Sequence, residues 1–448
     1  MTEGKTTQVL CRLFVFFLIS AGCALAQVTI PGTPAGHTLQ AWLDAFNSGD
    51  RAKIETYVKT IDPSQSVDDM LSFRSMTGGV DLLSIESSEP LHIRFRVKEK
   101  GGSATTALGN LLVKDGQPTT VATFGLRALP PGAVLENVTI DAAMRKKVVD
   151  GIESNLNEYY VEPTVAKQMV DAMKAHAAKG DYDKISDGDE LATRLTKDLQ
   201  DVSHDKHLRV NFSPFKTPQR ADPTPEDEAR FHQQMEHANC AFQKVEILPG
   251  NIGYIKFDGF MDAGFCGPTV NATMAFIAHT DAIIFDIRQN GGGQPAMVTL
   301  IASYLFDKPT HLIDIYNRKE DTTSQNWTLS YLPSPRLSKQ PVFVLTSKRT
   351  FSGAEEFAFD LKNQKRATII GETTGGGAHP VSGHPVADYF TIGVPFAKSL
   401  DPITKTNWEG TGVEPDVKVP ATDALTTAEK LAKEKIQAKT DDKKADSK

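Results

Sequence analysis

The sequence is poor in the features that mark several large classes of protein. It has four cysteines among 448 residues, too few for a small scaffold held together by disulfides. Its formal net charge is −7 and it has no basic cluster, so we do not expect it to bind nucleic acid. After residue 26 no apolar run is long enough to span a bilayer. Apolar residues make up 40%, which is typical of globular proteins, and the length predicts two or three domains.

The first 26 residues have the layout of a secretory signal peptide. Lys5 and Arg12 precede the apolar run Leu13–Ile19, and residues 24–26 (ALA) have the small-x-small form of a cleavage site. The run is short for a membrane span, although an anchor that stays attached is the alternative. We therefore expect cleavage after Ala26 and export to the periplasm or the extracellular space, with no transmembrane segment left.

Only two cysteines remain after the signal segment. Cys240 and Cys266 flank a predicted hairpin formed by residues 242–248 and 252–260. In an oxidising compartment they can form a disulfide at the open end of this hairpin. Two cysteines are too few for a metal site, and we expect neither a metal nor a cofactor.

Residues 35–130 form the first predicted domain. Leu39–Val58 has amphipathic helical spacing with a break at residues 47–50, and three strand-like segments follow at 91–98, 107–114 and 119–126. A helix carrying AFNSGD before such a sheet resembles the nuclear-transport-factor-2-like (SnoaL-like) family. The resemblance implies a cone-shaped α+β domain. We find no acid and base together here, so a binding or docking role is favoured over catalysis.

Three further regions follow a proline-rich boundary at residues 129–132. Residues 137–213 are largely helical and end in a strand at 208–212. Residues 240–422 alternate strands and helices up to a strand at 390–394, which is the order of an α/β domain. Residues 423–448 are lysine-rich and helical; we expect a charged tail whose last dozen residues are disordered.

The most informative stretch is residues 341–378. Val342–Leu345 is an apolar run typical of a buried strand. From residue 354 onward, apolar side chains recur at helical spacing, and two glutamates occupy the first turn. Ser352 therefore stands at the start of a helix, beside backbone amides that can receive an oxyanion. The alternative is that Ser352 is only a helix cap.

Five motifs occur in one order along residues 140–420. They are DKHL (205–208), GYI (253–255), DIRQNGGG (286–293), TFSGAE (350–355) with GETT (371–374), and GVEPD (412–416). In this order they resemble the tail-specific (C-terminal processing) and tricorn-core serine peptidases, a family that includes interphotoreceptor retinoid-binding protein.

The resemblance implies a Clp-protease/crotonase-like α/β core with Ser352 as the nucleophile. Tail-specific members carry a lysine base where this chain has Gly377, which excludes a Ser–Lys dyad there. Tricorn-like members use a histidine and a glutamate, which match His207 and Glu409. The resemblance also assigns the oxyanion amides to Gly292 and Gly353.

Several alternatives remain open from the sequence. His204 lies three residues from His207 and could be the base instead, and Lys206 departs from the tricorn-type pattern of a small hydroxyl residue before the histidine. The resemblance implies peptides or unfolded proteins as the substrate. Too few residues lie between His207 and the predicted hairpin for a PDZ domain. A non-catalytic binder of hydrophobic ligands or peptides is the main rival, an acyl-CoA enzyme is a weaker one, and a homo-oligomer is left open.

Overall fold

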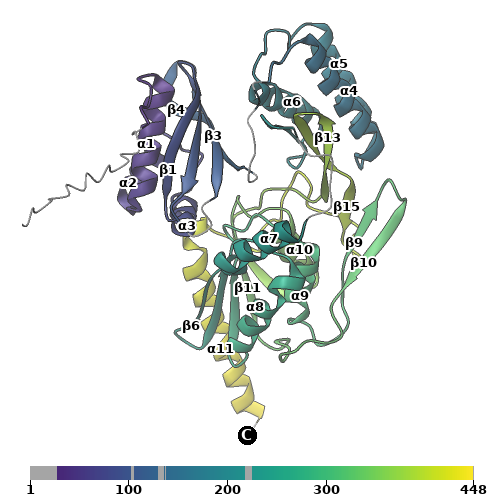
Figure 1. Cartoon of the computed structure of the whole chain (residues 1–448). Coiled ribbons are helices and arrows are strands. Elements are labelled where there is room, and N and C mark those ends of the chain that lie inside the picture. Colours follow the sequence, from purple (N-terminus) through teal and green to yellow (C-terminus); the bar gives the residue numbers. More distant parts are fainter. Residues whose placement is uncertain (1–27, 102–104, 130–135, 137, 217–223, 447–448) are drawn as a thin grey trace, which may run out of the picture. The chain divides into compact units, whose positions relative to one another are not determined.

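The computed structural model describes most of the chain, namely residues 28–101, 105–129, 136, 138–216 and 224–446. The predicted signal peptide therefore lies outside the described residues. The chain divides into two compact units, Met1–Pro130 and Pro131–Lys448, both drawn in Figure 1. Within the described ranges, no helix is both long enough and apolar enough to cross a membrane.

The first unit packs three helices against one antiparallel sheet. Trp42 of α1 lies 6.1 Å from the ring of Phe95 and 4.8 Å from that of Phe124. The strands follow one another in the sheet as β1-β2-β3-β4. The elements are α1 (Pro34–Ser48), α2 (Arg51–Thr60), α3 (Val67–Thr77), β1 (Val80–Ser88), β2 (His92–Glu99), β3 (Thr106–Lys114) and β4 (Gln117–Ala128).

The helix break near residues 47–50 is present, because Gly49 ends α1 with a left-handed φ of 63°. The sequence analysis missed α3 and β1. In α3 only Met70 and Thr77 are buried, so its apolar pattern is too weak to predict a helix.

The second unit is built around a six-stranded sheet with the order β16-β12-β11-β8-β7-β6. All neighbouring strands are parallel except the antiparallel hairpin β6–β7. The strands are β6 (Phe242–Leu248), β7 (Ile252–Phe257), β8 (Ala282–Asp286), β11 (Val342–Thr346), β12 (Ala367–Gly371) and β16 (Val417–Lys418). The predicted strands at 342–345 and 281–286 are its central members.

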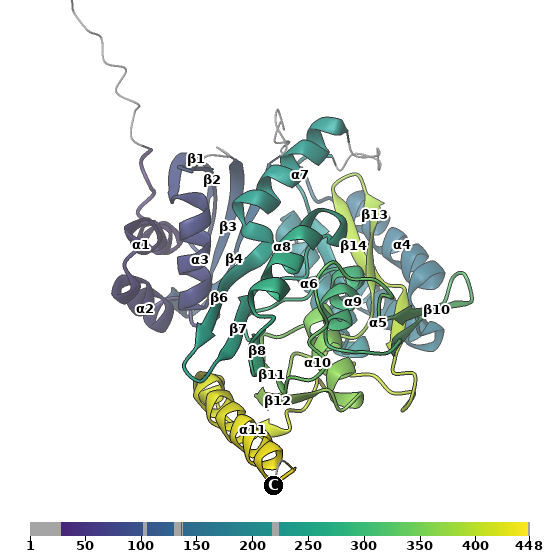
Figure 2. The same ribbon diagram turned by 90° about the horizontal axis from the view of Figure 1, so that it is seen from below.

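Both faces of this sheet are covered, which explains why its central strands are apolar throughout. Alternate residues such as Phe285 and Val344 share a core with the helices that follow β7, β8 and β11. Their neighbours Ile284 and Leu345 share a second core with the C-terminal helix. The helices, shown from a second side in Figure 2, are α8 (Ala263–Phe276), α9 (Pro295–Ser303), α10 (Gly353–Asn363) and α11 (Ala424–Asp446).

The C-terminal segment is helical, as predicted, but the helix continues to Asp446, where disorder was predicted, and it is not a solvated tail. Residues 424–446 form helix α11, and its first half packs on the sheet. Ala424, Ala428 and Ala432 are fully buried. Their spacing of four places them on one helix face, where small side chains let the helix approach the sheet closely. Lys430 and Lys433, which lie between and just after these alanines, are exposed.

A buried charge on this alanine face is expected to destabilise the second unit. We predict that Ala428→Glu lowers the free energy of unfolding by about 3 kcal/mol or more, because an unpaired carboxylate would be buried against apolar strands. The matched control is Lys430→Glu, which adds a glutamate to the same helix at an exposed position. Urea unfolding followed by circular dichroism measures both; equal effects would contradict the packing.

The helical region shares its core with a separate antiparallel sheet of order β13-β14-β5. The strand predicted at 390–394 exists as β14, but its assignment to the parallel α/β sheet is wrong. Only two residues join β13 to β14, and so short a loop forms an antiparallel hairpin. The elements are α4 (Ala142–Tyr159), α5 (Pro163–Ala178), α6 (Gly188–Ser203), β5 (Arg209–Phe212), β13 (Val381–Ala387) and β14 (Phe390–Pro395).

The remaining elements lie at the periphery of the second unit. Helix α7 (Pro225–His237) precedes the hairpin β6–β7. A third sheet has the order β10-β9-β15 and is antiparallel. Its strands are β9 (His311–Asn317), β10 (Thr322–Trp327) and β15 (Ala397–Leu400).

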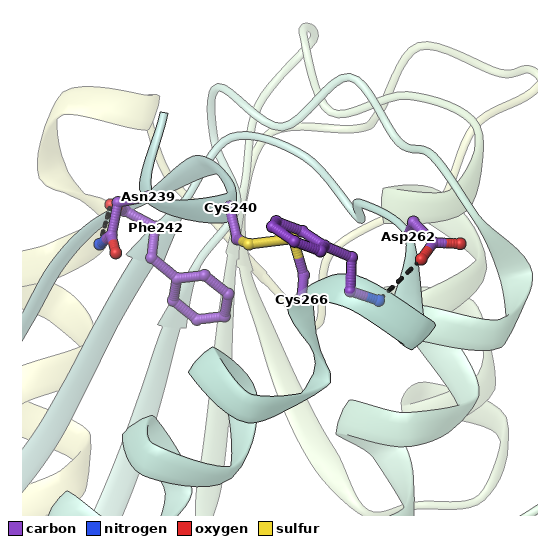
Figure 3. The surroundings of a disulfide bond; sticks show 6 residues. Asn239, Cys240, Phe242, Asp262 and Cys266 are labelled. Carbon is purple, nitrogen blue, oxygen red and sulfur yellow. Dashed lines mark hydrogen bonds between the residues drawn. A yellow bond between two sulfur atoms is a disulfide. The ribbon is translucent and has the colours of Figure 1, made fainter. Parts of the chain in front are cut away.

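A disulfide joins the two cysteines that follow the signal segment. Cys240, in the turn before β6, is bonded to Cys266 in α8, with a Cα–Cα distance of 5.7 Å. Figure 3 shows the bond beside Phe242, whose ring stacks on Phe257. The bond therefore fixes the start of β6 to the first helix that covers the sheet.

Candidate active site

Ser352 occupies a strained turn between β11 and α10. Its backbone has φ 55° and ψ −124°, a combination that costs a non-glycine residue about 1–3 kcal/mol. An ordinary cap in the same chain differs: Ser66, before α3, is extended with φ −105° and ψ 136°. Helix caps normally have such extended values. Capping alone therefore does not explain the conformation of Ser352, and strain of this kind is typical of a serine exposed on a strand-to-helix turn.

Glu355 holds this turn against the glycine loop that follows β12. Its buried carboxylate accepts hydrogen bonds from the amide of Ser352 at 2.9 Å, of Gly376 at 2.6 Å and of Gly377 at 2.8 Å. The hydroxyl of Thr374 donates a fourth bond. Burial raises the pKa of Glu355, although these hydrogen bonds act in the opposite direction. The sequence analysis used Glu355 only as a first-turn charge and missed this role.

The glycine turn after β8 lies directly against Ser352. The carbonyl of Asn290 accepts a hydrogen bond from the amide of Phe351 at 3.1 Å. Gly292 has a φ of +101°, and a Cβ there would lie 2.7 Å from the nitrogen of Gly353 and 2.8 Å from Ser352 Cβ. Only glycine fits this space.

The two backbone amides predicted to bind an oxyanion differ in whether they already donate a hydrogen bond. Gly353 is the first residue of α10, and its amide donates no hydrogen bond to any described residue. The amide of Gly292 instead donates to Asn290 Oδ1 at 2.9 Å. Gly292 is therefore already bonded here, which the sequence did not predict. The motif residues Asp286 and Arg288 form a buried ion pair of 2.6 Å and hold the turn.

His207 reaches the site because β5 pairs with β14. Its ring centroid lies 4.6 Å from that of Phe351, the residue before Ser352. The imidazole is 9% exposed, and its Nδ1 has no hydrogen-bond partner. Burial lowers the pKa of His207, which favours the neutral ring that a general base needs. Both His207 and Ser352 are among the described residues, and no hydrogen bond joins them. Catalytic hydrogen bonds between a base and a nucleophile often tighten only when substrate binds.

The neighbouring candidates His204 and Lys206 are both exposed, unlike His207. His204 is exposed and ends α6 with a left-handed φ of 57°. Lys206 is exposed, and its ammonium donates to the carbonyl of Gly375. Of the alternatives that the sequence left open, only His207 lies at the turn that carries Ser352.

Glu409 lies beside His207, together with two residues that sequence analysis did not assign to the site. Ligand atoms of Asp205, His207 and Glu409 all lie within 4.8 Å of one another. Glu409 Oε2 accepts a hydrogen bond from the amide of Ala378 at 2.6 Å, whereas Oε1 is buried without a partner. His379 Nδ1 lies 2.7 Å from Asp205 Oδ2 and 3.7 Å from Glu409 Oε2. His379 lies two residues after the triple glycine, but no spacing rule connects it to Asp205.

The same cluster is the set of described residues that comes nearest to a cation site. Asp205 already accepts hydrogen bonds from the amide of His207 at 3.0 Å and from His379. His207 Nδ1 and Glu409 Oε1 are then the two possible ligand atoms that have no hydrogen-bond partner. Structural zinc sites use four ligands and catalytic ones three, so the geometry favours acid–base chemistry over a resident metal.

The second unit is thus an α/β domain with a strained serine, a buried histidine and two buried carboxylates at one end of its parallel sheet. The family model for peptidase family S41 matches residues 251–419, and that for the N-terminal domain of peptidase S41 in eukaryotic IRBP matches residues 137–249. Residues 251–419 thus form a peptidase family S41 domain, and residues 137–249 form an S41 N-terminal domain.

Individual related proteins share little sequence identity with the chain. The chain is 28% identical over 187 residues to carboxyl-terminal-processing peptidase 2, chloroplastic, of Arabidopsis thaliana; the match covers 39% of this chain and 34% of that protein. The chain thus matches about a third of that relative's length.

Two solved structures illustrate the structural likeness. The photosystem II D1 C-terminal processing protease has a TM-score of 0.40 at 14% identity, over 62% of this chain and 93% of that one. The tricorn protease has a TM-score of 0.43 at 12% identity, over 80% of this chain and 46% of that one.

Replacing Ser352 with glycine is expected to stabilise the fold while removing the hydroxyl. Glycine adopts φ 55° without steric cost, whereas alanine keeps the strain. We predict that Ser352→Gly unfolds with a free energy about 1 kcal/mol higher than Ser352→Ala, after the entropic cost of glycine is included. Urea unfolding of both variants tests this, and a less stable glycine variant would contradict the strain.

Proposed function

We propose that the chain is an exported serine endopeptidase that cleaves peptides or unfolded proteins through an acyl-enzyme. The strained backbone of Ser352 is the observation that carries the proposal. A strained residue is retained only where the surrounding structure forces it, and such residues cluster at active sites. Family membership and the tail-processing relative support peptide bonds as the substrate.

The proposed reaction assigns one role to each residue of the site. Ser352 Oγ forms a bond to the scissile carbonyl carbon while His207 Nε2 takes its proton. His207 then gives this proton to the leaving amine as the C–N bond breaks, and water hydrolyses the ester by the same steps. Glu409 orients the ring of His207 and stabilises its charged form. A neutral, buried imidazole suits this work near neutral pH.

The developing oxyanion is proposed to bind at the glycine turn. The Gly353 amide provides the first hydrogen bond. Gly292 provides the second when the oxyanion replaces Asn290 Oδ1 as its acceptor, because a charged oxygen accepts more strongly than an amide oxygen. The absence of a side chain at Gly292 leaves room for the substrate carbonyl beside Ser352.

We propose export from the signal-like residues 1–26 together with the disulfide between Cys240 and Cys266. Disulfides form and persist mainly in oxidising compartments. We also propose that residues 35–130, 137–213 and 240–422 form three separate domains.

We infer that the first of these domains is a cone-shaped, nuclear-transport-factor-2-like accessory domain. Its three helices against a four-stranded antiparallel sheet support this assignment. A groove of about 500 Å³ runs beside Ala45 and Tyr57 of its first two helices. It contains no acid–base pair comparable to the site at Ser352, which favours binding or docking.

The proposal is tested with a fluorophosphonate probe and a peptide library on the full chain. We expect the wild type to be labelled and to hydrolyse peptides. Ser352→Ala should abolish both activities with little change in melting temperature. His207→Ala should reduce both by at least about a hundredfold, the scale of general-base catalysis.

The matched control is Ser66→Ala, which removes a serine from an ordinary helix cap. It should leave labelling unchanged and destabilise only the first unit, by about 1 kcal/mol. Turnover that persists in Ser352→Ala would overturn the proposal. A wild type that is never labelled would favour the non-catalytic binder.

A further inference from the structure

His379 lies between the two buried carboxylates beside the proposed base. It is 8% exposed, and Asp205 is 1% exposed. The imidazole Nδ1 bonds to Asp205 Oδ2 at 2.7 Å and lies 3.7 Å from Glu409 Oε2. These residues come from three separate segments: the end of α6, the glycine loop, and the loop before β16. Their convergence therefore depends on the tertiary fold.

Two buried carboxylates this close cannot both stay ionised without a positive charge nearby. Burial, followed by the charge of Asp205, raises the pKa of Glu409 to about 7, whereas the charge of His379 acts to lower it. Burial alone would lower the pKa of His379, but the hydrogen bond to Asp205 and the charges of Glu409 and Asp205 outweigh burial and raise it. The arrangement favours a protonated His379 shared by two carboxylates.

We propose that His379 is a positioning residue, a buried cation shared by Asp205 and Glu409 that keeps Glu409 charged and available to His207. The inference rests on the proposed function. Glu409 Oε1 and His207 Nδ1 are both buried and without hydrogen-bond partners, although Asp205 Oδ1 lies 4.0 Å from His207 Nδ1. An ionised Glu409 can accept the Nδ1–H of His207 and stabilise the imidazolium that forms when Ser352 is deprotonated. A protonated Glu409 cannot stabilise it in this way.

The other titratable groups facing this cluster come from several elements. Tyr160, after α4, donates weakly to Asp205 at 3.5 Å. Glu162 adds a further negative charge near His379, and Glu355 adds one near Glu409. Besides burial, which lowers it, the pKa of His207 is raised by the charge of Asp205 and lowered by the charges of His379 and Arg209. His379 is the one group of this set in contact with both carboxylates.

The first experiment compares the pH dependence of kcat/KM for the wild type and His379→Gln. Glutamine retains a donor for Asp205 but carries no charge. Glu409 should then require a higher pH to ionise, so the acidic limb of the profile should move upward. We expect kcat/KM at pH 6.5 to fall roughly tenfold, which corresponds to a shift of about one pH unit. Above the pH at which the wild-type His379 loses its proton, the two profiles should converge.

The second experiment removes one carboxylate from the uncharged variant. In Asp205→Asn with His379→Gln, Glu409 no longer faces the negative charge of Asp205, so the acidic limb should move back toward the wild type. A role for His379 in packing alone predicts no such recovery, because replacing Asp205 does not restore the missing imidazole. The double variant also leaves no carboxylate unpaired at Asp205, so it remains informative if His379→Gln folds poorly.

The matched control is His384→Gln, five residues further along the chain. His384 is half-buried, bonds to Ser382 and stacks on Tyr159. Its replacement should leave the pH profile unchanged. An unshifted profile in His379→Gln, or a double variant worse than the single one, would overturn the inference while leaving the proposed function intact. Turnover in Ser352→Ala would overturn both.

Discussion

The carboxylate of Glu355 is the contact on which the rest of the site depends. It is buried and bonded to the amides of Ser352, Gly376 and Gly377. One side chain thus fixes both the strained serine and the loop that carries the residues around His379. Amides that are held in place satisfy a buried charge without a counter-ion, and they make the geometry rigid. The strain at Ser352 persists because this contact leaves the backbone no alternative.

The parallel sheet explains why segments so distant in sequence meet at this point. Strands β8, β11 and β12 run side by side, and each is followed by one part of the site: the glycine turn, the serine, and the loop from Thr374 to Ala378. Carboxyl ends of parallel strands share one edge, where α/β proteins place their sites. His207 does not belong to this sheet. His207 directly precedes Leu208 and β5, and the pairing of β5 with β14 places it at the site. The same pairing joins the helical region to the rest of the second unit.

The sequence contained the local parts of this arrangement but not its long-range contacts. The strand at 342–345, the helix after Ser352 and the glycine turn all follow from short patterns of apolar residues and glycines. The role of His379 depends on a residue 174 positions away, a distance that no pattern spans. The packing of helix α11 on the sheet was missed for a different reason. Its alanines every four residues did carry the signal, but the lysines around them resemble a solvated tail.

Two buried acidic centres lie close together in this site, and they are neutralised in different ways. Glu355 is held by fixed backbone dipoles, which do not titrate. Glu409 and Asp205 depend on a histidine, whose charge changes within the physiological range. The serine turn should therefore keep its shape across this pH range, while the charge beside His207 varies. Placing the titratable group next to the base, rather than next to the nucleophile, lets protonation affect the chemistry without loosening the strained turn.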